Sequence, residues 1–135
     1  MSTAVTHRVQ TRWRDFDGLG HVNNAVAFTY LEEGRDEFLR RHGIGRDQYV
    51  VGRCWADFKH EIDLSCEQLT VECELRELGR SSLTTAQRIL DEEGGVVVEA
   101  EFGLVLWDPG RRQSRPIAEA ERAALEASLR GEEQA

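Results

Sequence analysis

Carboxylate, imidazole and carboxamide side chains are concentrated in one short stretch of the chain, residues 12–24 (RWRDFDGLGHVNN). Its aspartates, Asp15 and Asp17, are candidates for a nucleophile or a general base. Its glycines allow a tight turn and a close approach of the backbone to a ligand. A helical pattern follows directly, and the unpaired N–H groups of a helix start can stabilise an oxygen that gains negative charge. The stretch therefore predicts a reaction site.

A strand and a long helix are predicted on either side of this stretch. Residues 5–13 alternate loosely between apolar and polar side chains, which indicates a first strand. Residues 24–42 follow a helical repeat, with Asn23 or Asn24 as a candidate N-cap. The apolar stripe of this helix consists of Ala27, Tyr30, Leu31, Gly34 and Phe38. A glycine inside a helix costs about 1 kcal/mol relative to alanine, so we expect close packing against a sheet at Gly34.

The rest of the chain predicts a sheet and a second helix. Residues 49–108 alternate with a period of two, which indicates four antiparallel strands in a meander, with a hairpin loop at residues 91–95. Even-numbered residues such as Val50, Cys54 and Phe58 are expected on one face. Residues 116–130 predict a short helix that begins with proline, followed by a frayed end at 131–135. One helix covers only part of the apolar face of so long a sheet, and long edge strands expose unpaired backbone groups that must be protected. We therefore expect edge-to-edge dimerisation.

Length and composition limit the class of protein. The chain has 135 residues, 40% of them hydrophobic and 31% charged, which is typical of a single globular domain spanning residues 1–135. The net charge of −8 disfavours nucleic-acid binding. No apolar run approaches the roughly 18 residues needed to span a bilayer, and no leader is apparent, so we expect a cytoplasmic protein without a membrane partner. The three cysteines lack metal-site spacing, and we expect no metal.

One string within the polar stretch resembles the signature of a known family. The string Asp15-x-Asp17-x-x-Gly20-His21-Val22-Asn23-Asn24 is similar to that of the hotdog-fold acyl-CoA thioesterases of the 4-hydroxybenzoyl-CoA thioesterase family. Supporting pieces are Leu31-Glu32-Glu33-x-Arg35-x-x-x-Leu39, Leu78-Gly79-Arg80-Ser81-Ser82 and Arg115-Pro116-Ile117. The resemblance implies an α+β hotdog fold, in which a five-stranded antiparallel sheet wraps around a long central helix and a short C-terminal helix follows.

The resemblance also implies an activity and its residues. It implies a thioester hydrolase that acts on an acyl-CoA or acyl-carrier protein, with coenzyme A as part of the substrate and no cofactor. Asp17 would attack the thioester carbonyl or activate a water that does so, while Asp15 is expected to be structural. The backbone N–H of Asn24 would polarise the carbonyl, and His21 and Asn23 would shape the loop and orient the carboxylate or the water.

Substrate binding is expected to involve Gly20 and Ala27, together with Arg80, Ser81, Ser82 and Arg115, which would contact the coenzyme A moiety. Related sequences usually carry tyrosine at the position of Ala27, so we expect a bulkier acyl group than a short straight chain. Alternatives are a non-catalytic acyl-CoA-binding or scaffold protein and, less favoured by the spacing of Asp15 and Asp17 to His21, a hotdog dehydratase or hydratase. A homodimer or homotetramer is expected.

Overall fold

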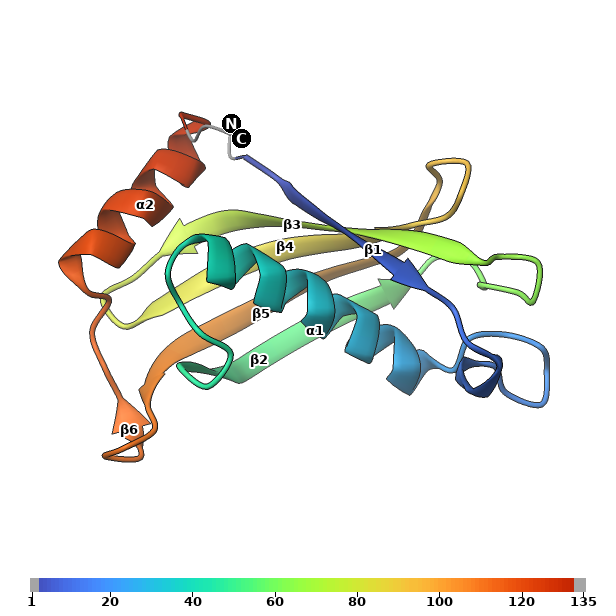
Figure 1. Cartoon of the computed structure of the whole chain (residues 1–135), viewed down its shortest axis with the longest axis horizontal. Helices are drawn as coiled ribbons and strands as arrows, with labels where there is room; N and C mark the ends of the chain where they lie inside the picture. Colours follow the sequence, from blue (N-terminus) through green and yellow to red (C-terminus); the bar gives the residue numbers. More distant parts are fainter. Residues whose placement is uncertain (1–2, 133–135) are drawn as a thin grey trace.

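The main element of the fold is one antiparallel sheet. The structure is a computed structural model that describes residues 3–132. The long strands of the sheet are β1 (Val5–Gln10), β2 (Tyr49–Phe58), β3 (Gln68–Leu78), β4 (Ser82–Leu90) and β5 (Val96–Asp108). Figure 1 shows helix α1 (Asn24–Arg41) lying across one face of this sheet and helix α2 (Glu119–Arg130) at one end. The predicted α+β fold, a five-stranded sheet around a long helix with a short C-terminal helix, is confirmed.

The order of the strands differs from the predicted meander. The sheet runs β1-β3-β4-β5-β2, so only β3, β4 and β5 follow one another, and β2 pairs with β5 at the far edge. The connection after β2 stays attached to β5, because the N–H groups of Lys59 and His60 both donate to the carbonyl of Val97. A register shift between Val51 and Arg53 also moves Val50 off the face that Cys54 occupies, contrary to the simple alternation.

Helix α1 packs closely against the sheet at Gly34, as predicted. A Cβ atom at this position would lie 2.4 Å from Cγ1 of Val71 on β3, so a larger residue would displace the helix. A buried hydrogen bond of 2.7 Å from Nε2 of Gln87 on β4 to the carbonyl of Leu31 fastens the helix at the same level. These contacts fix the position of the helix and therefore of its first residues.

Several element boundaries differ from the sequence-based expectation. Strand β1 ends at Gln10 rather than at 13, because the chain turns into a short 3-10 helix, η1 (Trp13–Asp15). The two-residue strand β6 (Gln113–Ser114), which pairs with the end of β5, was not predicted. Helix α2 begins at 119 rather than 116 and ends at Arg130 as predicted, where Gly131 caps it with φ +73°. The fraying expected for residues 131–135 stays a prediction. Residues 133–135 lie outside the described residues.

The fold places its polar loops at two ends. In Figure 1 the β1–α1 loop and the β2–β3 connection lie at the right, whereas α2, β6 and the β3–β4 turn lie at the left. The signature residues, 15–24, therefore lie at the end of the sheet opposite to α2.

Of the helices in residues 3–132, none is long and apolar enough to cross a membrane.

Candidate active site

Asp15 anchors the loop between β1 and α1. Its carboxylate is buried and accepts hydrogen bonds from the hydroxyl of Tyr30 and, at 3.0 Å, from the backbone N–H of Arg12. Its carbonyl accepts a bond of 2.9 Å from the N–H of Asn23. Burial, followed by the hydrogen bond to Asp15, raises the pKa of Tyr30 well above its usual range. These contacts agree with the structural role predicted for Asp15.

Asp17 is held in a tight turn and is exposed. Its N–H donates to the carbonyl of His21 over 2.8 Å, and its carbonyl accepts from the N–H of Gly20, which has φ +77°. Its Oδ1 atom accepts bonds from the N–H groups of Leu19 at 2.9 Å and His21 at 3.3 Å. In the described part of the chain, Oδ2 accepts no hydrogen bond. One oxygen of this carboxylate is therefore fixed, and the other is available to a ligand.

The start of α1 supplies a free backbone donor beside this carboxylate. Asn23 is the N-cap: its side chain accepts from Ala25 N at 2.8 Å, and its carbonyl accepts from Val26 and Ala27. The N–H of Asn24, the first helical residue, has no hydrogen-bond partner within residues 3–132. Such a donor at a helix start can stabilise an oxyanion. The predicted roles of Asn23 as a loop-shaping residue and Asn24 as a donor are consistent with this geometry.

A cavity of about 580 Å³ brings these groups together. Its polar wall consists of Asp17, His21, Asn23, Asn24, Lys59, His60 and Glu61. Its apolar wall consists of Leu19, Val22, Ala27, Phe58, Ile62 and Val98. Among the predicted site residues, Asp17, His21, Asn23, Asn24 and Ala27 therefore meet in one place. Gly20 lies beside the cavity in the turn, where its ideal Cβ would be 3.5 Å from Leu64.

The segment that follows β2 forms the cavity wall facing the signature loop. Its backbone is joined to that loop by a hydrogen bond of 2.7 Å from Val22 N to the carbonyl of Ile62. Glu61 Oε2 lies 2.9 Å from Nε2 of His21, and Lys59 pairs with Glu99 at 3.2 Å. Sequence reasoning missed Lys59, His60 and Glu61, because no motif marks them and only the pairing of β2 with β5 brings them here.

The residues predicted to contact coenzyme A lie elsewhere in the same chain. Ser82 is opposite Val105 on β5, whereas Val98 of the cavity is opposite Ile89. Because a strand rises by about 3.3 Å a residue, Ser82 lies roughly 20 Å from the cavity along the sheet. Arg80 and Ser81 belong to the β3–β4 turn that directly precedes Ser82, the first residue of β4. A single chain therefore does not bring Arg80, Ser81 and Ser82 to the cavity.

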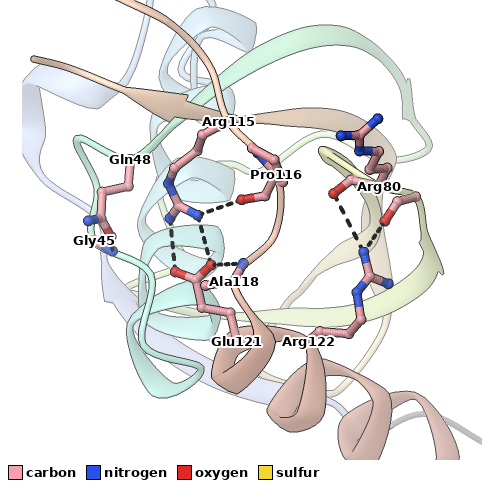
Figure 2. Close-up of polar contacts among 9 residues, drawn as sticks. Gly45, Gln48, Arg80, Arg115, Pro116, Ala118, Glu121 and Arg122 are labelled. Atoms are coloured by element: carbon pink, nitrogen blue, oxygen red, sulfur yellow. Dashed lines mark hydrogen bonds and ion pairs between the residues drawn. The ribbon is translucent and has the colours of Figure 1, made fainter. Parts of the chain in front are cut away.

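Arg115 is also at this far end, and its guanidinium is committed to a structural contact. Figure 2 shows Arg115 forming two hydrogen bonds of 2.8 Å to Glu121, whose carboxylate also accepts from Ala118 N at the start of α2. Beside them, Arg122 donates to the carbonyls of Gly79 and Arg80. Arg115 and Arg122 fasten α2 to the sheet, so the structure gives the predicted substrate-binding role of Arg115 no support.

No three His, Cys, Asp or Glu side chains among the described residues form a group that could hold a metal ion. The expectation that the protein needs no metal and no cofactor stays a prediction.

Comparison with known proteins relates the chain to thioesterases. It is 27% identical over 116 residues to the acyl-CoA thioester hydrolase YbgC of Escherichia coli, covering 81% of this chain and 86% of the relative. A Thermus thermophilus thioesterase solved with coenzyme A and zinc is 34% identical, with a TM-score of 0.80 and coverage of 90% and 97% of the two chains.

A predicted thioesterase from Bacillus stearothermophilus has a TM-score of 0.83 at 23% identity, covering 93% of this chain and 96% of the other, and shows the shared fold. Residues 11–125, which include the signature loop, helix α1 and the cavity wall, match the thioesterase-like superfamily. The chain therefore belongs to the thioesterase-like superfamily.

Proposed function

We propose that the protein hydrolyses the thioester of an acyl-CoA to a free acid and coenzyme A in the Asp17 cavity. The observation that carries this proposal is the meeting of an exposed carboxylate, Asp17, and an unpaired helix-start donor, the Asn24 N–H, in one cavity. The relatives support the substrate class, because one is named an acyl-CoA thioester hydrolase and another was solved with coenzyme A.

In the proposed reaction the thioester oxygen accepts a hydrogen bond from the Asn24 N–H. The free Oδ2 atom of Asp17 then either bonds to the carbonyl carbon or takes a proton from a water that bonds to it. In both routes the carbon–sulfur bond breaks, and the thiolate leaves and takes up a proton. In the first route, water then hydrolyses the acyl anhydride formed on Asp17. A preorganised donor such as Asn24 contributes about 3 kcal/mol of transition-state stabilisation.

The acyl group is proposed to lie along the apolar wall. Ala27 is 2% exposed and lines the cavity together with Phe58 and Val98. The small side chain leaves room that a larger residue would fill, so bulky acyl groups fit best. Replacing Ala27 with leucine is expected to lower kcat/KM for branched or aromatic acyl-CoA esters more than for short ones. Equal losses across the panel would contradict this assignment.

A second copy of the chain is proposed to complete the site. Strand β2 is an edge strand whose Trp55 and Phe58 side chains are 47% and 41% exposed. Two β2 strands pairing antiparallel across a two-fold axis would protect this edge and place the start of one β2 beside the end of the other. The partner's β3–β4 turn would then lie at the cavity end, where its Arg80, Ser81 and Ser82 could contact coenzyme A.

The test is hydrolysis of a panel of acyl-CoA esters and an acyl-carrier protein, with thiol release compared between the wild type and Asp17→Ala. We expect release by the wild type and a loss of about a hundredfold or more in the variant. A wild type that binds acyl-CoA without hydrolysing it would favour a scaffold function instead. Sedimentation is expected to show a dimer or tetramer, and a monomer would contradict the shared site.

A further inference from the structure

One polar contact in the cavity joins the signature histidine, His21, to a residue that belongs to no motif. Nε2 of His21 lies 2.9 Å from Oε2 of Glu61, and both residues line the cavity with Asp17. We propose that Glu61 is a positioning residue that holds the His21 imidazole in the cavity wall beside Asp17 with its Nε2 atom protonated. This inference rests on the proposed function, because it assigns a role in the same reaction.

The backbone that carries Glu61 is fixed on both sides. Before it, the N–H groups of Lys59 and His60 donate to Val97 on β5 over 2.9 and 3.2 Å. After it, the carbonyl of Ile62 accepts from Val22, and Asp63 forms a bridge with His21. The Glu61 carboxylate therefore extends from a backbone position that is already joined to the signature loop.

The other charged groups of this wall are occupied by other partners. The Lys59 ammonium pairs with Glu99 at 3.2 Å, and Nδ1 of His60 contacts the carbonyl of Glu61 at 2.9 Å rather than its carboxylate. The Asp63 carboxylate accepts hydrogen bonds from the backbone and hydroxyl of Ser65. Glu61 is therefore the carboxylate that binds the imidazole of His21.

This pairing has a defined chemical consequence. A carboxylate that accepts from one ring nitrogen of a histidine fixes the tautomer and the orientation of the ring. With Nε2–H bonded to Glu61, Nδ1 is the atom that remains to hold a water or a substrate group. His21 also donates its backbone N–H to Asp17 Oδ1, so the same residue is linked to both carboxylates.

The chain contains a matched control for this pair. His7 and Glu33 lie 3.5 Å apart with side chains 32% and 46% exposed, close to the 35% and 51% of His21 and Glu61, and neither lines the cavity. Removal of Glu33 therefore reproduces the loss of a half-exposed His–Glu pair without touching the site. Any effect specific to Glu61 must come from the cavity.

The test compares kcat and KM for an acyl-CoA ester among Glu61→Ala, Glu61→Gln, Glu33→Ala, His21→Ala and the double variant His21→Ala/Glu61→Ala. We expect Glu61→Ala to lower kcat about tenfold with KM within about twofold of the wild type. Glu61→Gln, which keeps an acceptor oxygen, should restore most of kcat, and Glu33→Ala should change neither constant. The double variant should be no slower than His21→Ala. Additive losses in the double variant, or equal behaviour of the two alanine variants, would overturn the proposal.

A second measurement separates this inference from the proposed function. The ring nitrogen shifts of His21 in NMR spectra are expected to show a single Nε2–H tautomer in the wild type and a mixture in Glu61→Ala. The same tautomer population in both proteins would overturn the positioning role, whatever the activity. Absence of hydrolysis across the whole panel, with the tautomer still dependent on Glu61, would instead count against the thioesterase assignment.

Discussion

The two ends of the sheet carry similar polar residues but use them differently. At the α2 end, Arg115 and Glu121 satisfy each other through two hydrogen bonds, and Arg122 is bonded to backbone carbonyls. At the cavity end, Asp17 keeps one oxygen and Asn24 keeps its N–H without a partner in the described residues. The difference teaches that hydrogen-bonding capacity left unused, rather than the amount of charge, distinguishes the proposed reaction site from the α2 end.

The largest expected effect is that of Asp17→Asn on activity. Asparagine keeps an oxygen that can accept from Leu19 and His21, so the turn should persist. The substitution removes the carboxylate that is proposed to attack the thioester or to take a proton from water. We expect kcat to fall by about a hundredfold or more while Tm stays within about 2 °C of the wild type. Steady-state kinetics and calorimetry on the same preparation check both parts. Near-normal kcat would move the chemistry to another residue.

Asp15→Ala should produce the opposite result two residues away. Its buried carboxylate is the acceptor for Tyr30 and the Arg12 N–H, and its loss leaves both donors unpaired. We expect unfolding in urea to be easier by about 2–3 kcal/mol. Tyr30→Phe removes one of the two donors together with its need for a partner. It should therefore lower the free energy of unfolding by less than Asp15→Ala does. Unchanged stability of Asp15→Ala would contradict the anchoring role.

At the far end, Glu121→Ala should affect stability without affecting the reaction. The change removes the bidentate partner of Arg115 and the carboxylate that accepts from Ala118 N. A loss of about 1–2 kcal/mol in the free energy of unfolding is expected, with kcat per folded molecule unchanged. If kcat fell as far as in Asp17→Asn, the distinction between the two ends would fail.

The Arg115–Glu121 pair also predicts a pH dependence of stability. Two sets of hydrogen bonds hold the pKa of Glu121 below its usual range. Those from Arg115 have the larger effect, and that from the backbone N–H of Ala118 has the smaller one. The unfolded chain therefore binds the proton more readily, so the stabilisation is complete above the unfolded pKa and is lost as the pH falls through the folded pKa. The free energies of unfolding in urea of the wild type and Glu121→Gln should differ at pH 7, and the difference should disappear as the pH falls through the folded pKa of Glu121. A constant difference would contradict this origin.

The smallest expected effect is that of Arg80→Ala. If the partner's turn contacts coenzyme A, removing the exposed Arg80 side chain should raise KM by about threefold to tenfold and leave kcat unchanged. An exposed ionic contact contributes roughly 1 kcal/mol to binding. Arg111→Ala, another exposed arginine of the same end, is the control. Identical KM values for the wild type and both variants would remove the β3–β4 turn from the proposed site.

Much of the geometry of the candidate site could be predicted from the sequence, because it depends on residues that are close together along the chain. The signature residues Asp17, Asn23 and Asn24 are neighbours along the chain, and the N-cap and turn follow from their residue types. Glu61 and Phe58 could not be predicted, since they reach the cavity only through the pairing of β2 with the far strand β5.

The same distinction applies to the fold. The buried stripe of α1, including Gly34, follows from the helical repeat, whereas the crossing of β2 to the far edge does not follow from alternation. The role of Arg115 was also beyond sequence reasoning, because its partner Glu121 is set by the packing of α2.

The most direct test of the central claim is an experimental structure with coenzyme A bound. We predict that the thiol sulfur lies in the cavity formed by Asp17, Asn24 and Ala27, with the nucleotide toward the β3–β4 turn of a second copy. A thiol bound at the α2 end or on the open face of the sheet, with the Asp17 cavity vacant, would contradict it.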